Sequence, residues 1–313
     1  MRFSRFRTAG TSAASAVLFA AALTACAAPG DGKTENTGKA LLAEAFPAAV
    51  KERGTLTVGL KVPNPPLQFM DPQEQLTGID IDLYRELGTL SGLKIEFVRL
   101  TSASLIPALQ SGKIDATGVL LPSAERLAVA DFVVYLKVPF GVLVPKSNPH
   151  GVQRAADLCG RRVALVQGQT PPEAVVADRS KKCVAAGKEA IKTREYPDNA
   201  AAYLSIKAGQ SDAMVQSEAL TGFLARTVDG GGSYASVRDD EGLGGTVNFA
   251  DGFAVKKGQS ELLDAIKAGL VKLHENGTYH RILDKYGVAA DAVSAITINQ
   301  LGPKDLAAVP AGK

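Results

Sequence analysis

The sequence predicts an α/β fold of two lobes, each a mostly parallel sheet flanked by helices. From residue 54, apolar residues at period two alternate with apolar residues spaced three or four apart, which are the patterns of strands and helices. The same alternation restarts at residue 162, and residues 135–148 join the two runs. Alternating strands and helices build layered folds rich in parallel strands, so each run is expected to form one lobe.

The first run is expected to contain three strands and two helices. Leu83, Leu87 and Leu90 form one face of a helix that begins near Asp80 and ends at Gly92. Asp80 and Asp82 do not share a helical face, so we interpret them as charges at the helix start rather than as an acid–base pair. The expected strands span 55–60, 94–100 and 114–119, and the second helix spans 104–110.

The second run has the same organisation. Pro171 and Pro172 suit the first turn of a helix, where a missing N–H costs nothing, so the loop at 168–173 leads into a helix. Ligands of open α/β sheets bind beyond the carboxyl ends of the strands, so we expect the site in the cleft between the lobes. Further strands are expected at 162–166, 191–196, 211–215 and 253–255, and further helices at 199–208, 218–227, 260–276 and 278–286.

Residues 1–25 are expected to be an export signal. Three arginines precede an apolar core, Ala13 to Leu23, which is too short to span a bilayer but suits a secretory signal. The following Leu23-Thr24-Ala25-Cys26 resembles the lipobox of bacterial lipoproteins, which implies cleavage before Cys26 and a lipid on its sulfur. A plain signal peptide with an incidental cysteine is the alternative. Two or more acyl chains would anchor the protein to the outer face of the cell membrane.

The mature chain is expected to be an electrically neutral, soluble monomer on a lipid tether. Removal of residues 1–25 takes away three arginines and no acid, and leaves cations equal in number to the 32 acidic residues. Such a balance argues against a nucleic-acid binder. No later apolar run reaches transmembrane length. Residues 26–45 are expected to be the lipidated cysteine and a flexible tether, and residues 291–313 a loosely held tail.

The remaining cysteines are Cys159 and Cys183. Export would place them in an oxidising compartment, where such a pair is expected to form a disulfide. Metal ligation and a nucleophilic role are the alternatives, but His150, His274 and His280 show no ligand spacing with these cysteines. We expect no metal and no cofactor.

A series of short motifs between residues 54 and 288 resembles the extracellular solute-binding proteins of polar-amino-acid ABC importers. They include Gly54-Thr55-Leu56-Thr57-Val58-Gly59, Gly78-Ile79-Asp80-Ile81-Asp82, Gly112-Lys113-Ile114-Asp115-Ala116, Glu125-Arg126, Gln167-Gly168-Gln169-Thr170 and Asn276-Gly277-Thr278-Tyr279. The resemblance implies the type II periplasmic-binding-protein fold with two crossover hinge segments. Lobe one is then 46–138 plus 246–290, and lobe two is 139–245. Ligand binding would close the hinge, and the closed form would dock on a membrane permease.

The resemblance implies that Arg126 holds the carboxylate of the solute. A guanidinium can grip a carboxylate with two parallel hydrogen bonds, which a lysine cannot do. A surface ion pair with Glu125 is the alternative. Thr170 matches the family's threonine at a helix N-terminus, which suits a carboxylate, although Thr is also a common helix cap. Gly118 and Leu120 match the cleft floor, where only their backbone groups could replace the family's usual hydroxyls.

Other matched positions depart from the family pattern. Where members that bind ordinary amino acids have an aspartate for the ammonium, this chain has Ser217, so Glu218 would have to substitute or the ligand is not a standard α-amino acid. The positions of the family's aromatic sandwich are Asn64 and Ser102. Lys61 stands where members that select cations have an acid. Lys61 is either a solvated loop cation or, with Arg126, half of a site for two anionic groups.

The function predicted from these residues is capture of a small polar solute with a carboxylate and its delivery to an ABC permease. A secreted dehydratase on the same scaffold, acting on a prephenate-like acid with Glu173 or Glu218 as general acid, is the alternative. Tyr135, near the first crossover, could contact ligand or pack in the core. A sensory ectodomain is disfavoured, because no transmembrane helix or cytoplasmic domain follows.

Overall fold

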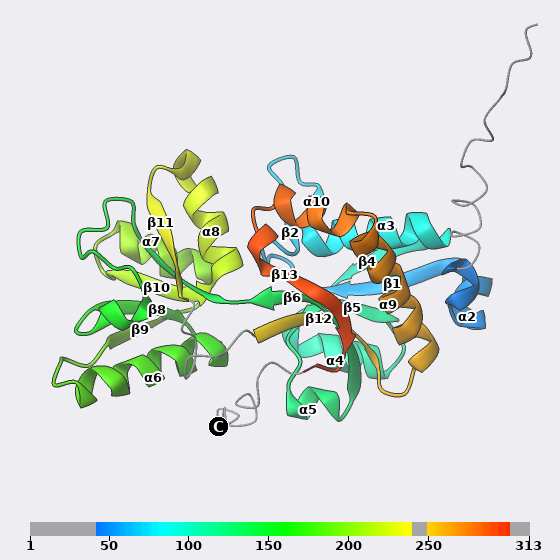
Figure 1. Ribbon diagram of the computed structural model, residues 1–313, viewed down its shortest axis with the longest axis horizontal. Helices are drawn as coiled ribbons and strands as arrows, with labels where there is room; N and C mark the ends of the chain where they lie inside the picture. The colour runs from blue at the N-terminus through cyan, green and yellow to red at the C-terminus, as the bar shows by residue number, and fades with distance from the viewer. Residues whose placement is uncertain (1–41, 240–248, 301–313) are drawn as a thin grey trace, which may run out of the picture.

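The computed structural model describes residues 42–239 and 249–300, which form two lobes side by side (Figure 1). Lobe one contains a six-stranded sheet in the order β13-β6-β12-β5-β1-β4, and lobe two a five-stranded sheet in the order β11-β7-β10-β8-β9. The two-lobed α/β prediction is therefore confirmed. Within the described residues, no helix is both long and apolar enough to cross a membrane.

The elements of lobe one come from both ends of the chain. Its strands are β1 (Thr55–Leu60), β4 (Lys94–Arg99), β5 (Ala116–Leu120), β6 (Ala130–Val138), β12 (Phe249–Lys256) and β13 (Ala292–Ile298), with a small hairpin of β2 (Phe69–Met70) and β3 (Leu76–Thr77). Its helices are α2 (Ala48–Arg53), α3 (Ile79–Ser91), α4 (Ser102–Gln110), α5 (Ala124–Leu127), α9 (Ser260–Glu275), α10 (Thr278–Lys285) and the 3-10 turn η3 (Ala289–Asp291).

Lobe two is one continuous stretch of chain. Its strands are β7 (Phe140–Pro145), β8 (Arg162–Val166), β9 (Lys192–Tyr196), β10 (Ala213–Ser217) and β11 (Tyr234–Asp239). Its helices are α6 (Thr170–Ala185), α7 (Asn199–Lys207) and α8 (Glu218–Thr227), with the 3-10 turns η1 (Ala155–Leu158) and η2 (Val228–Gly231).

Each sheet is parallel in only one half, which refines the expectation of mostly parallel sheets. β4, β1 and β5 run parallel, whereas β12, β6 and β13 each pair antiparallel with their neighbours. In lobe two, β9, β8 and β10 run parallel, and β7 and β11 are antiparallel. β6 of lobe one leads through Pro139 directly into β7 of lobe two. One extended segment therefore contributes an antiparallel strand to each sheet. The second crossover, from β11 to β12, includes residues 240–248, which lie outside the described residues.

Apolar side chains cover both faces of each sheet. In lobe one, α3, α9 and α10 bury one face, with Leu83, Ile266 and Leu283 in a single cluster, and α4 buries the other face through Leu105 and Leu109. In lobe two, η1 and α6 cover one face, and α7 and α8 cover the other. The expected glycine stop at the end of α3 is confirmed, because Gly92 adopts the left-handed conformation there with φ of 72°.

Two segments are more structured than the sequence predicted. Residues 292–298 were expected to be a loose tail but form β13, which pairs with β6 and buries Val293 and Ile296. Residues 42–45, expected to be tether, are helical, and Leu42 and Phe46 are each only 2% exposed against lobe one. Both segments carry enough apolar side chains to bury, which outweighs their Ala- and Gly-rich surroundings. Cys26 and residues 301–313 lie outside the described residues.

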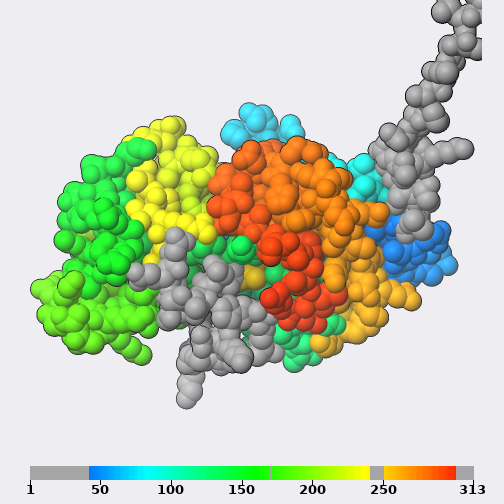
Figure 2. All heavy atoms as spheres, in the orientation of Figure 1, coloured from blue at the N-terminus to red at the C-terminus, as the bar shows by residue number. Residues whose placement is uncertain are grey.

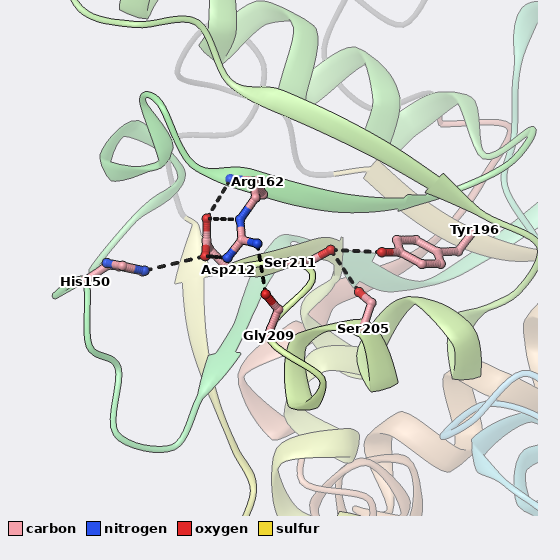
Figure 3. A network of polar contacts seen from close by, with 7 residues as sticks. All are labelled: His150, Arg162, Tyr196, Ser205, Gly209, Ser211 and Asp212. Carbon is pink, nitrogen blue, oxygen red and sulfur yellow. Dashed lines mark hydrogen bonds and ion pairs between the residues drawn. The ribbon is translucent and has the colours of Figure 1, made fainter.

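One aspartate in each lobe holds two parallel strands together at their amino ends. Asp115 accepts hydrogen bonds from the Thr57 backbone N–H at 2.8 Å and from Arg53 Nη2 at 2.6 Å. In lobe two, Asp212 accepts from the Arg162 backbone N–H at 2.8 Å and from Arg162 Nη2 at 2.6 Å (Figure 3). The shared role explains why Asp115 and Asp212 each stand in a Gly-x-x-Asp-Ala motif, residues 112–116 and 209–213. Both aspartates lie at the amino edge of their sheet, opposite to the carboxyl edge where a ligand is expected.

The two lobes touch beside the hinge strands. The Phe69 and Phe223 rings meet edge to face with centroids 5.2 Å apart. Arg226 Nη2 donates to the Tyr286 carbonyl oxygen at 2.8 Å, and Arg238 Nη1 lies 2.7 Å from Asp291 Oδ1. In Figure 2 the yellow atoms of lobe two accordingly abut the orange and red atoms of lobe one. Any rotation of one lobe against the other must rearrange these contacts.

A disulfide joins Cys159 to Cys183, as predicted, with an S–S distance of 2.05 Å. It connects the end of η1 to α6, and Cys183 is 3% exposed within the apolar cluster of lobe two. This bond rules out the metal and nucleophile alternatives for these two cysteines in the oxidised protein.

Replacement of both cysteines by serine should lower the free energy of unfolding by about 3 kcal/mol, because the bridge restricts a loop of moderate length in the unfolded chain. Urea unfolding of the protein, followed by circular dichroism, would measure the loss of unfolding free energy. Wild-type protein in dithiothreitol should show a comparable loss, and a variant as stable as oxidised wild type would contradict the role of the bridge.

Asp212→Asn should destabilise the protein near neutral pH but not in strong acid. Hydrogen bonds from Arg162 lower the pKa of Asp212 to about 2, so the carboxylate adds stability above pH 4 and loses that contribution as pH falls toward 2. The expected loss is about 1 kcal/mol at pH 7, with allowance for solvent screening. Urea midpoints at pH 7 and pH 2.5 would measure it, with Asp264→Asn on the exposed side of α9 as the control. An equal loss at both pH values would contradict this account.

Candidate functional site

Three charged side chains lie within electrostatic range of one another at the carboxyl edge of the parallel strands of lobe one. Lys61 directly follows β1, Arg126 follows β5 in the short helix α5, and Asp251 lies in β12. Gly252 pairs with Leu120 at the end of β5, which places Asp251 beside the turn into α5. Asp251 interacts electrostatically with both Lys61 and Arg126. The structure therefore brings the two predicted cations together and adds a carboxylate that the sequence reasoning did not identify.

Arg126 is held in place from two sides. Its backbone N–H donates to Ser123 Oγ at 3.2 Å, which caps α5, and its Nη1 donates to the Leu121 carbonyl oxygen at 2.7 Å. Burial lowers the pKa of Arg126, and the charges of Glu125 and Asp251 act in the opposite direction. Within the described residues, Nε and Nη2 donate no hydrogen bond. The guanidinium is thus fixed at one nitrogen while donors remain for a carboxylate.

Burial perturbs the other two groups of the cluster in opposite senses. Asp251 is 7% exposed, and burial, with the nearby charge of Asp80, raises its pKa to about 7, against the effect of Lys61 and Arg126. Burial lowers the pKa of Lys61, which the charge of Asp251 partly offsets and that of Arg126 reinforces. Ionised, the three side chains carry one net positive charge, less than the pair of cations alone would give.

Asp80 supports this edge from inside lobe one. It is fully buried and accepts hydrogen bonds from Gln68 Nε2 at 2.5 Å, from the Val119 backbone N–H at 2.6 Å and from the Tyr135 hydroxyl. Gln68 Oε1 in turn accepts from the Lys61 backbone N–H at 2.7 Å. Burial raises the pKa of Asp80 to about 6, and the three donors limit the rise.

The structure corrects the interpretation of Asp80 and decides between the two roles considered for Tyr135. Asp80 stands at the start of α3, but its main role is interior, because its carboxylate bonds to three segments of lobe one rather than facing solvent. Tyr135 is also fully buried: its hydroxyl donates to Asp80 and its backbone carbonyl accepts from the Tyr279 hydroxyl at 2.7 Å. Of the two roles considered for Tyr135, core packing is the one that the structure supports.

The other predicted residues of lobe one divide into scaffold and surface. Gly118 faces Gln68, and a Cβ there would collide with the Gln68 amide, so this glycine makes room for Gln68 rather than for ligand. The Leu120 side chain is buried with Leu105, so only its backbone can face the cleft. Asn64 is partly buried and pairs with Gln68 through its backbone. Ser102 is exposed at the first turn of α4.

In lobe two, the predicted residues gather at the carboxyl ends of β8 and β10. Ser217 ends β10 and caps α8, where its Oγ accepts from the Leu220 N–H at 3.4 Å. The Glu218 backbone N–H donates to the Pro139 carbonyl oxygen at 2.8 Å, and its carboxylate lies beside Gly222. Thr170 is the first residue of α6, and its side chain lies outside what the structure describes.

A group of amides adjoins Ser217 that the sequence reasoning did not single out. Gln216 Nε2 donates to Gln169 Oε1 and to Asn199 Oδ1, the latter at 3.2 Å, and Gln216 Oε1 accepts from the Ser217 N–H at 3.1 Å. Gln216 is buried. Amides can donate or accept, so this edge of lobe two offers a polar surface without net charge. In the parts of the chain that the structure describes, no group of three or more His, Cys, Asp or Glu could hold a metal.

Two α/β lobes, with the strand pair β6–β7 passing from one to the other, are typical of proteins that bind a small solute. The comparisons agree with this class. The chain matches the model of bacterial extracellular solute-binding proteins, family 3, over residues 56–289, and it belongs to that family.

Relatives and solved structures cover most of the chain. The arginine-binding protein ArgT of Corynebacterium glutamicum is 28% identical, with 81% of each chain covered. An L-arginine-binding protein of Pseudomonas aeruginosa is 32% identical, with 73% of this chain and 86% of the relative covered. An ancestral amino-acid-binding protein described as a precursor of cyclohexadienyl dehydratase has a TM-score of 0.62 at 30% identity, covering 76% of this chain and 97% of that one. The protein is thus a solute-binding protein of an ABC importer.

Asp80→Leu should cost at least 3 kcal/mol of unfolding free energy, because it leaves three buried donors without an acceptor. Asp80→Asn should cost about 1 kcal/mol, since the amide can still accept from Val119 and Gln68 and donate to Tyr135. Thermal or urea unfolding of the two variants would test this difference. Equal losses in both variants would contradict the proposed hydrogen-bond network.

Proposed function

We propose that this solute-binding protein captures an amino acid or a related small carboxylate between its lobes, with Arg126 as the carboxylate clamp. The observation that carries the proposal is the Arg126 guanidinium at the carboxyl sheet edge, which is anchored to the Leu121 carbonyl and whose Nε and Nη2 donate no hydrogen bond to the part of the chain that the structure describes. A planar fork of donors matches a carboxylate. Thr170, at the N-terminus of the 16-residue helix α6, would contribute the facing donors of lobe two.

Lys61 narrows the range of solutes. Although several relatives are named for arginine, this chain has a partly buried cation beside Arg126. A cationic side chain near Lys61 would be repelled, whereas a neutral or acidic one would not. We therefore propose that the solute is not cationic. Asn64 and Gln216 would supply neutral hydrogen-bonding groups around it.

The protein is proposed to act by binding rather than by catalysis. The relatives described above are named as binding proteins. Release of an unchanged solute to a permease requires only a clamp and a hinge, and the chain has candidates for both. A dehydratase would need Glu173 or Glu218 as general acid, so conversion of prephenate by the purified protein would overturn this part of the proposal.

The N-terminal segment supports a proposal about the cellular location of the protein. We propose that Cys26 carries lipid and that the monomeric protein is held at the outer face of the cell membrane. The first described residues pack on lobe one near α2, at the end of the molecule away from lobe two (Figure 1). An anchor that enters there would leave both lobes free to close. Radiolabelled palmitate should enter the wild-type protein in cells but not Cys26→Ala.

Arg126→Ala should weaken solute binding at least 100-fold, and Arg126→Lys about 10-fold, because lysine keeps the charge but loses the paired hydrogen bonds. Calorimetry with protein stripped of bound ligand by unfolding and refolding would measure this against the standard L-amino acids and small dicarboxylates. Lys113→Ala, an exposed cation at the amino end of β5, is the matched control. Unchanged affinity in Arg126→Ala would contradict the clamp.

A further inference from the structure

Asp251 differs from the other buried carboxylates of lobe one. Asp80 accepts three hydrogen bonds, and Asp131 accepts from Lys257 Nζ, the Gly258 N–H and Asn299 Nδ2 at 2.7–3.0 Å. Asp251 is 7% exposed, yet its carboxylate accepts no hydrogen bond within the described residues. A buried carboxylate without donors is costly, so an absent group that brings donors would stabilise it.

The backbone is irregular at Asp251, because β12 shifts register against β6 between Asp251 and Gly252. Shifts of this kind re-aim side chains and are common beside binding sites. The charged or titratable groups that interact with Asp251 are Lys61 after β1, Asp80 in α3, Arg126 in α5 and Tyr135 in β6. Two of these four are the proposed ligand-binding cations.

An α-amino acid carries its carboxylate and its ammonium on the same carbon atom. A protein that binds both must therefore place a cation and an anion next to each other. Arg126, in the short helix after β5, and Asp251, near the start of the neighbouring strand β12, are candidates for such a pair. The ammonium brings three N–H donors, which is what the Asp251 carboxylate lacks. Ser217, which caps α8 in lobe two, offers no charge for this purpose.

We propose that Asp251 of lobe one binds the α-ammonium of the solute, beside Arg126 on the carboxylate. This inference rests on the proposed function of Arg126. The alternative of a ligand with two anionic groups would place a second negative charge against Asp251, which the site would oppose.

The proposal predicts that binding releases protons. With a pKa of about 7, Asp251 is about half protonated at pH 7 in the ligand-free protein, and the ammonium needs the ionised form. Affinity should therefore rise about 10-fold from pH 6 to pH 8, with about half a proton released per ligand at pH 7. Calorimetry of the tightest-binding L-amino acid in buffers of different ionisation enthalpy would measure both quantities. A dicarboxylate would show the reverse, with proton uptake and weaker binding at higher pH.

Asp251→Asn keeps the shape of the side chain and removes its charge. It should weaken amino-acid binding at least 10-fold and abolish the pH dependence, whereas the matched control Asp264→Asn should change neither. The 2-hydroxy analogue of the bound amino acid, which lacks the ammonium, should bind wild type no better than it binds Asp251→Asn. If Asp251→Asn does not fold, the pH dependence of wild type alone still tests the proposal.

The failures of the two proposals are distinguishable. Binding that is lost in Arg126→Ala but retained in Asp251→Asn would overturn the role of Asp251 and leave the clamp intact. Binding of succinate or glutarate with proton uptake, and of no amino acid, would do the same. If no standard L-amino acid or dicarboxylate binds the stripped protein at millimolar concentration, both proposals are overturned.

Discussion

The Asp80 carboxylate is the group on which the carboxyl edge of the parallel strands of lobe one depends. It connects the loop after β1, strand β5 and strand β6 through Gln68, Val119 and Tyr135. An ionised carboxylate in an apolar interior is unfavourable unless several donors compensate it, and these three do so in part. Through Gln68 the same network fixes the backbone of Lys61, so a carboxylate inside lobe one determines where a partly buried cation lies. Gly118 belongs to this network, since only a residue without a side chain leaves space for Gln68.

The two edges of each sheet have different tasks. At the amino ends, Asp115 and Asp212 perform the same structural role in the two lobes, each bonding the backbone of the neighbouring parallel strand. At the carboxyl ends the lobes differ: lobe one presents Lys61, Arg126 and Asp251, whereas lobe two presents the amides of Gln216, Gln169 and Asn199. Because an aspartate at the amino edge already holds the parallel strands together in each lobe, the residues at the carboxyl edge can differ between the lobes.

The alternating pattern of the sequence was sufficient to predict most of the fold. β1, β8 and α8 have the expected bounds, and the disulfide is the predicted one. Strands β6 and β7 were not predicted, because residues 135–148 were interpreted as the connection between the lobes although both strands carry apolar, β-branched runs. Strands β11 and β13 were not predicted either, because pairing with β7 and β6, far away in the chain, defines them. At the candidate site, matched positions suggested Arg126 and Lys61, and the structure places both at one edge of the lobe-one sheet. Asp251 was missed although an acid inside an apolar strand is an available signal, and Gln68 gave no signal, since its importance depends on a partner twelve residues away in the chain.

The pairing of β13 with β6 has a consequence for the order in which the protein folds. Lobe two is built from residues 140–239 in sequence, with its disulfide inside one stretch, so its contacts form between segments that are close in the chain. Lobe one must bring β1 and β5 together with β12 and β13, from the opposite end of the chain, across the whole of lobe two. Closing so large a loop is slow, since its entropy cost precedes any gain from contacts. Lobe two can therefore become native before the last strand of lobe one has paired, and the apolar sheet face of lobe one remains exposed for that interval.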